Sequence, residues 1–226
     1  MIEWSAIFLT FKLALVVCVV LLAIGTPIAT WLSFTRWRWK FLIESVVALP
    51  LVLPPTVLGF YVLVAVGSNS PLGRWYRDLS GHGLPFTFAG LAIASIIYSL
   101  PFAVQPMVAA FSQVDRNLID ASSILGASRL RTFFRIVMPL SIGGVVTGIV
   151  LSFAHTLGEF GVVLMVGGNI PGVTQTVSIA IYDNVQALDY AAANRMALLL
   201  LGFSFVTLSI TYAINRRVWT VWPMHR

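Results

Sequence analysis

Apolar residues gather in five long runs along the chain, and the shorter stretches between the runs hold most of the charged residues. Each run has roughly 20 or more mostly apolar residues, which is the length that an α-helix needs to cross the hydrocarbon core of a bilayer. The alternating pattern of a transmembrane β-barrel is absent, so helices are the expected elements. The predicted membrane-spanning helices cover Ile7–Leu32, Phe41–Val66, Phe86–Phe111, Met138–Leu157 and Met196–Ile214.

Composition strengthens this prediction. Hydrophobic residues make up 58% of the 226 residues, charged residues make up 10%, and the mean hydropathy is +0.92. Soluble domains have a smaller apolar share. The predicted fold class is therefore an all-α polytopic membrane protein of the cell membrane, with one transmembrane domain over residues 1–226. The first run lacks a basic start and a small-residue cleavage site, so we interpret it as a helix rather than a signal peptide.

The positive charges indicate which way the chain faces. Ten of the fourteen lysines and arginines fall in alternate connections between the runs or after the last run. Because cytoplasmic loops carry an excess of Lys and Arg, we expect the amino terminus outside and the carboxyl terminus in the cytoplasm. Five spans fit that orientation. The ten residues are Arg36, Arg38, Lys40, Arg116, Arg129, Arg131, Arg135, Arg216, Arg217 and Arg226.

The connection over residues 112–137 is expected to form two short cytoplasmic helices. Asp115 can cap the first helix, because its carboxylate can accept a hydrogen bond from an N–H of the first turn. Gly126 is expected to end that helix, and Ser128 is expected to cap the next one. One side of the first helix carries Leu118, Ala121, Ile124 and Leu125 at helical spacing.

The spacing alone leaves two interpretations of this helix pair. In the first, an amphipathic helix lies at the membrane surface and its arginines contact anionic lipid. In the second, the pair docks a soluble partner, whose surface can approach closely where the residues are small. The small residues are Ala121, Ser122, Gly126 and Ala127.

The segment DASSILGASRLRTFFRIVMP, residues 120–139, resembles the cytoplasmic coupling motif of the permeases of binding-protein-dependent ABC importers. The positions in register are Ala121, Gly126, Ile136 and Pro139, and the departures are Asp120 for Glu, Ser122 for Ala and Met138 for Leu. The resemblance implies that this loop seats in a cleft of an ATPase subunit and transmits its closure to the membrane helices. The expected ATPase-coupling residues are Asp120, Ala121, Ser122, Gly126, Arg129, Ile136 and Pro139.

Two further stretches, residues 48–67 and 157–186, resemble the molybdate branch of this family. The resemblance implies a translocation path for molybdate; related permeases for tungstate and for sulfate or thiosulfate share much of the pattern and stay as alternatives. The implied partners are a dimer of ABC ATPase subunits, an external molybdate-binding protein, a second copy of this chain and the lipid bilayer, with no nucleic acid.

The chain itself is expected to be a transport subunit rather than an enzyme. It has no phosphate-binding loop of the GxxxxGK(S/T) type, so ATP and magnesium are expected to be used by the partner ATPase. We expect no catalytic residue, no metal ligand and no cofactor bound by this chain. A stand-alone secondary transporter is disfavoured by the five spans and their few charges, and an intramembrane enzyme by the lack of a catalytic constellation.

Prolines and polar residues mark the expected path. Pro54 and Pro55 interrupt the second run, and such breaks occur in lipid where they line a cavity or lie against other helices. A purely structural kink explains these prolines nearly as well. The family resemblance places residues 158–161 near an outer gate. The path and gate candidates are Pro54, Pro55, Thr56, Ser99, Gln105, Ser152, Gly158, Glu159, Phe160 and Gly161.

Four local features carry separate expectations. Gly144 and Gly148 allow close helix packing, either within the chain or across a dimer. His155 and Glu159 are four residues apart and are expected to form a hydrogen-bonded pair rather than a metal site. Residues 176–188 have helical spacing but are too short to span, so they lie at the outer surface or re-enter the bundle. The first helix is expected at the periphery, facing lipid.

Overall fold

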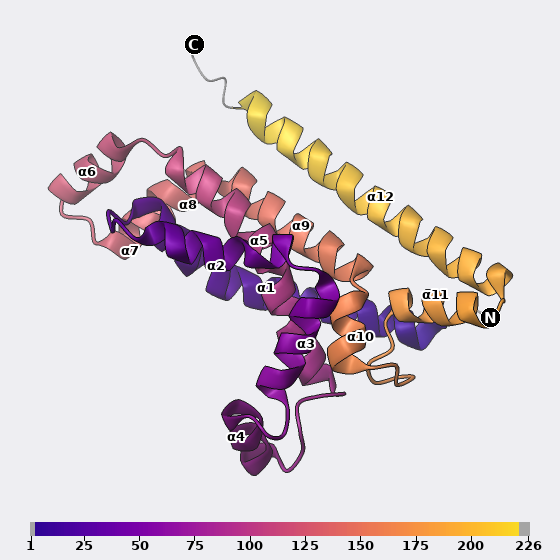
Figure 1. The fold of residues 1–226 in the computed structure, drawn as a ribbon. Helices are drawn as coiled ribbons and strands as arrows, with labels where there is room; N and C mark the ends of the chain where they lie inside the picture. The colour runs from indigo at the N-terminus through magenta and orange to yellow at the C-terminus, as the bar shows by residue number, and fades with distance from the viewer. Residues whose placement is uncertain (1–2, 222–226) are drawn as a thin grey trace.

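The computed structural model describes residues 3–221, and it describes the side chains of this range except those of residues 210–211 and 214–221. The predictions on the side chains of Arg216, Arg217 and Arg226 therefore lie outside the described residues. Every regular element in the described range is a helix, as expected for an all-α membrane protein. Figure 1 shows the helices as one elongated assembly.

Three helices are long and apolar enough to cross a membrane alone. They are α1 (Trp4–Phe34), α5 (Phe88–Ser112) and the part of α12 (Tyr190–Val221) that ends at Ser209. Two bent helix pairs also pass this test, so the described residues contain three spans, or up to five if each bent pair is one span. The five predicted runs thus correspond to three straight helices and two broken ones.

The second predicted span is not one continuous helix. It consists of α2 (Lys40–Val52) and α3 (Pro55–Val66), which meet at a bend of 115°. Leu53 ends α2 in an extended conformation, and Pro54 precedes α3. Two consecutive prolines lack the N–H groups that would continue α2, and the residue before a proline is pushed out of the helical region. The Pro54–Pro55 pair therefore accounts for the end of α2 at this point.

The fourth predicted span is also broken, near its start. A segment made of α7 (Arg129–Thr132), the π-helix η1 (Phe133–Val137) and α8 (Met138–Leu140) meets α9 (Ile142–Gly158) at 75°. The Met138 N–H donates to the carbonyl of Phe133, five residues back, which defines the π-turn. Such wide turns relieve local crowding, and here the next residue, Pro139, has no N–H to donate.

Four shorter helices complete the fold: α4 (Pro71–Ser80), α6 (Arg116–Ile124), α10 (Gly161–Gly167) and α11 (Val177–Gln186). In Figure 1, α6 and α7 form one end of the molecule, whereas α11 lies near the amino terminus at the other end. The expected helix over residues 176–188 is therefore α11. It packs against α12 and α1, and the Val177 N–H donates to Thr10 Oγ1 at 2.9 Å.

α5 lies at the centre of the bundle, between α1 and α9. The expectation of a peripheral first helix is only half right, because one face of α1 is fully buried, at Leu13 and Val17 for example, while Phe8 on the other face is 72% exposed. A Cβ added to Gly148 of α9 would lie 2.7 Å from the Ala103 carbonyl oxygen of α5. The small residues of α9 thus serve packing within the chain.

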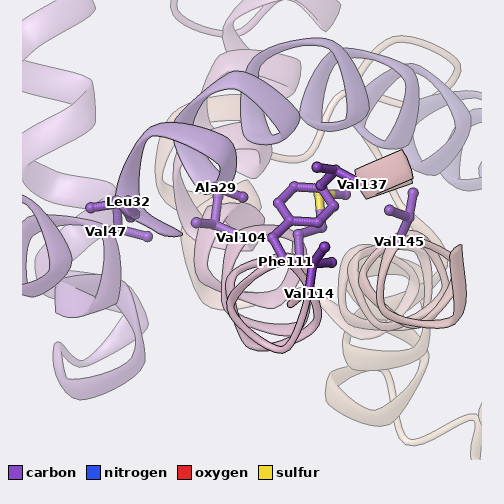
Figure 2. Packing of buried hydrophobic residues seen from close by; sticks show 9 residues of the cluster. Ala29, Leu32, Val47, Val104, Phe111, Val114, Val137 and Val145 are labelled. Carbon is purple, nitrogen blue, oxygen red and sulfur yellow. The ribbon is translucent and has the colours of Figure 1, made fainter. Parts of the chain in front are cut away.

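A hydrophobic cluster packs the α6–α7 end of the molecule against the membrane helices. Figure 2 shows Leu32 of α1 beside Val47 of α2, and Phe111 of α5 between Val114 and Val137. Phe111 is fully buried, and its ring lies 5.9 Å from that of Phe133 in the π-helix. Movement of the π-helix must therefore displace residues of the central helix α5, because close-packed side chains transmit displacements.

Candidate functional site

The first helix of the predicted coupling loop is α6, and its two ends have the expected caps. The Asn117 N–H donates to the Asp115 carboxylate at 2.9 Å, which satisfies a free donor of the first turn. Gly126 follows the helix with φ of 77°. A Cβ at this position would meet no atom within 4 Å, so the left-handed backbone, rather than crowding, is what requires glycine.

A pair of buried hydroxyls joins the two helices of the loop. The Oγ of Ser122 in α6 lies 2.8 Å from Oγ1 of Thr132 in α7, and these residues are 9% and 5% exposed. Ser128 caps α7 as expected, by accepting from the Arg131 N–H at 3.3 Å. The Ser122 side chain points inward and is engaged within the loop, while its role in ATPase coupling stays a prediction. Thr132 was not predicted, and no local pattern singles it out.

Three large apolar side chains protrude from the surface of the loop. Ile124 and Leu125 are each 86% exposed, and Leu130 is 68% exposed. We call these three residues the apolar knob. A protruding apolar patch at a loop between helices marks a site of protein or membrane contact. Ala121 and Gly126 are also exposed, so a partner can approach the backbone beside the knob.

The remaining coupling residues connect the knob to the rest of the molecule. Ile136 is half-buried in the π-helix and packs against the cluster around Phe111. Pro139 is exposed and is the second residue of α8. Asp120 and Arg129 are exposed on the inner side of the loop, where both line a cavity against the end of α1. The loop thus packs against the hydrophobic core through Ile136, and its apolar knob is exposed to solvent.

Most gate candidates meet where α3 and α10 begin. A Cβ added to Gly161 would lie 2.8 Å from Pro55 Cβ and 3.7 Å from the Thr56 nitrogen. One turn further, a Cβ on Gly59 would lie 2.8 Å from Met165 Cβ. Each helix therefore places a glycine against a side chain of the other: Gly161 of α10 against Pro55, and Gly59 of α3 against Met165. We call this contact the α3–α10 junction. It brings together two stretches that are about 100 residues apart in sequence and that the sequence analysis selected separately.

Glu159 stands at the entrance to α10 and is 4% exposed. The carbonyl of Glu159 accepts a hydrogen bond from the Ser178 hydroxyl, which links the junction to α11. The Glu159 carboxylate and the Ser95 hydroxyl are buried beside each other, and among the described side chains neither makes a hydrogen bond of ordinary geometry. The neighbouring Phe160 ring lies 5.0 Å from Tyr182. A buried polar group without a hydrogen bond raises the free energy of the folded state, so a rearrangement that satisfies this group is favoured.

The expected His155–Glu159 pair does not form. His155 Nδ1 instead lies 2.9 Å from the Ser99 hydroxyl, and its ring stacks on Phe102 at 4.0 Å. Ser99 also lies 3.1 Å from Thr156 Oγ1. The nearest polar partner of the imidazole thus comes from α5 rather than from the next turn of α9. In the described part of the chain, no group of three or more His, Cys, Asp or Glu is placed to hold a metal ion.

The polar path candidates differ in whether their side chains are buried. Ser152 is fully buried and donates back to the Gly148 carbonyl of its own helix at 2.7 Å. Gln105 is exposed on α5, and Thr56 is exposed at the start of α3. Of the polar candidates, Thr56 and Gln105 present their side chains on the surface of this chain, whereas Ser99 and Ser152 are engaged inside it.

A family model for the inner membrane component of binding-protein-dependent transport systems matches residues 22–220. The chain belongs to this family. It is a multi-pass component of the inner membrane and a transport subunit rather than an enzyme, as the resemblance of the loop implied. Among its relatives, it is 51% identical over 214 residues to the molybdenum transport system permease protein ModB of Azotobacter vinelandii, covering 95% of each chain.

A more distant relative and a solved structure agree with this membership. The chain is 35% identical over 215 residues to ModB of Escherichia coli, covering 95% of this chain and 94% of the relative. An inward-facing structure of the MetNI methionine ABC transporter has a chain of the same fold, with a TM-score of 0.76 and 16% identity over 96% of both chains. At that identity, the structural likeness establishes the fold alone.

Proposed function

We propose that this chain is the permease subunit of an ATP-driven importer and forms the path by which molybdate crosses the inner membrane. The assignment of molybdate as the substrate rests on the 51% identity, over nearly the whole chain, to a molybdenum transport permease. The observation that supports ATP-driven coupling is the capped helix pair with its apolar knob, at the position of the coupling motif.

In the proposed orientation the α6–α7 end is cytoplasmic and the amino terminus is outside. Arg36, Arg116 and Arg129 gather at the α6–α7 end, which fits the excess of basic residues on the cytoplasmic side. α4 and α10 then lie toward the outer side.

The proposed partner at the cytoplasmic end is an ABC ATPase. Burial of Ile124, Leu125 and Leu130 in a cleft of the ATPase removes their apolar surface from water, which favours association. ATP and magnesium are bound and used by that partner. Because such an importer has two ATPase subunits and this chain has one coupling loop, two copies of the chain form the transporter around a two-fold axis.

At the outer end, the proposed gate is the α3–α10 junction, where an external molybdate-binding protein delivers the anion. Thr56 and Gln105 supply neutral hydrogen-bond groups on exposed faces of α3 and α5. No lysine or arginine is buried among the described residues. A path without a fixed buried cation suits a dianion that must leave quickly, since conduction requires weak binding along the way.

The test is uptake of labelled molybdate by cells with and without the gene, in a background that lacks other molybdate importers. Loss of uptake on deletion, with competition by excess tungstate and little competition by sulfate, is expected. Competition by sulfate that equals competition by tungstate would assign the chain to sulfate or thiosulfate instead. Uptake that continues unchanged without ATP would contradict the ATP-driven mechanism and favour a secondary transporter.

A further inference from the structure

A cavity of about 530 Å³ lies between the end of α1 and the inner side of the α6–α7 loop. α1 contributes Thr30, Trp31 and Phe34, and the chain continues along the wall with Thr35 and Arg36. The opposite wall is formed by the side of α6 that faces α1 and by the first residues of α7 and η1. These residues are Arg116, Ile119, Asp120, Ser123, Arg129, Thr132, Phe133 and Val137.

The polar part of the cavity carries an excess of positive charge. Arg36, Arg116 and Arg129 reach it from three separate segments, and Asp120 is the one carboxylate among its lining residues. Among the described side chains the one ion pair joins Lys40 and Glu44, so none of the three guanidinium groups forms an ion pair with a described carboxylate. Guanidinium groups bind phosphate oxygens through paired N–H donors, and the Thr35 hydroxyl, which accepts from the Trp37 N–H, adds a donor that suits the same oxygens.

The rest of the cavity is apolar and lies at the end of a membrane-spanning helix. Trp31, Phe34 and Phe133 line it, and α1 crosses the bilayer over Trp4–Phe34. A tryptophan in the last turn of such a helix is typical of the headgroup region. A ligand that matches both walls carries a phosphate group and an apolar part, and reaches the cavity from the membrane. A free inorganic anion would leave the aromatic wall unused.

We propose that this cavity binds an anionic phospholipid, with its phosphate among Arg36, Arg116 and Arg129 and its glycerol and upper acyl chain along Trp31, Phe34 and Phe133. Basic pockets beside membrane helices bind anionic headgroups in this way. The bound lipid joins α1 to α6 and thereby fixes the coupling loop against the bundle. The knob stays accessible, because none of its three residues lines the cavity and each is at least 68% exposed.

The test measures lipid binding by the purified full chain and requires no transport. Dioctanoyl phosphatidylglycerol is titrated against the protein in a neutral detergent, with thermal stability and native mass spectrometry as readouts. We expect the triple variant R36Q/R116Q/R129Q to bind this lipid about 100-fold more weakly than the unmodified chain, since each cation near a membrane surface contributes about a factor of five to binding of anionic lipid. The triple variant R36K/R116K/R129K keeps the charges and should retain most of the binding, which also reports that the fold tolerates substitution.

The matched control is R38Q/R131Q/R135Q, which removes the same charge from neighbouring residues that do not line the cavity. This control should bind phosphatidylglycerol within about threefold of the unmodified chain, because the three exposed side chains do not line the cavity and salt weakens their attraction for the headgroup. Equal loss of binding in both glutamine triples would overturn the proposal in favour of diffuse attraction. Stabilisation by inorganic phosphate or molybdate as large as that by the lipid would also overturn it, and would assign the cavity to a free oxyanion.

Discussion

The α6–α7 loop and the α3–α10 junction are built in opposite ways. The loop is held by local polar contacts, such as the Asp115 and Ser128 caps, and it exposes apolar side chains. The junction is held by close packing at Gly161 and Gly59, and it buries a carboxylate at Glu159. A rigid element that exposes apolar surface is suited to bind in a cleft of a partner protein. A close contact beside an unsatisfied buried group is suited to separate and close again.

The loop and the junction should therefore tolerate substitutions differently. In the loop, a substitution that preserves the backbone but changes the exposed surface should spare the fold and abolish coupling. At the junction, a single added side chain should disturb the fold itself, because the neighbouring backbone has no room to move away. Substitutions at the two places should therefore fail in different ways.

The largest effect is expected at the junction. Gly161→Leu forces side-chain atoms into Pro55 and should lower the free energy of unfolding by about 3 kcal/mol, through overpacking. Gly158→Leu is the matched control three residues away, since a Cβ there meets nothing within 4 Å. Thermal unfolding of both variants in detergent checks this. Equal melting temperatures for the two variants would mean that the junction is loosely packed.

A smaller effect is expected at Gly126. Gly126→Val places a β-branched residue at φ of 77° and should cost about 1–2 kcal/mol of stability while disrupting ATPase association. Gly81→Val is the control, because Gly81 has φ of 79° and equally open surroundings at the far end of the molecule. Both variants should lose similar stability, and only Gly126→Val should lose association. Gly126→Asn should restore much of it, since Asn tolerates this backbone. Loss of association in the Gly81 variant as well would trace the defect to general instability.

The smallest effect is expected for the hydroxyl pair. A double-mutant cycle with Ser122→Ala and Thr132→Val should give a coupling energy of about 1 kcal/mol, the net worth of a typical buried hydrogen bond. The measurement is denaturation of the two single variants and the double variant. A coupling energy near zero would show that the loop is held by its caps alone.

The sequence was sufficient for the features that depend on a few neighbouring residues. Run length predicted the membrane-spanning regions, and cap chemistry predicted Asp115, Gly126 and Ser128, because a cap forms within three or four residues. The family resemblance of the loop was confirmed by the family match over residues 22–220.

Features that depend on packing between distant segments could not be predicted. The Pro54–Pro55 pair indicated a disturbance, but whether it gives a kink or a 115° break depends on α10 packing against α3. His155 bonds Ser99, which is 56 residues away, although Glu159 is nearer in sequence. Ser122 turns inward because Thr132 offers it a buried partner. The arginine-lined cavity likewise required the end of α1 to lie beside α6.

The central proposal is that the apolar knob binds the ATPase subunit. The most direct test measures whether the ATPase stays bound when the knob is changed. The double variant I124D/L125D is compared with L72D/L79D, which places the same charges on exposed leucines of α4 at the other end of the molecule. Co-purification of the ATPase with each variant from membranes, at matched permease levels, is the measurement. We expect I124D/L125D to lose the ATPase and ATP-driven uptake, while L72D/L79D keeps the ATPase bound. Retention of the ATPase by I124D/L125D would contradict the docking of the α6–α7 loop.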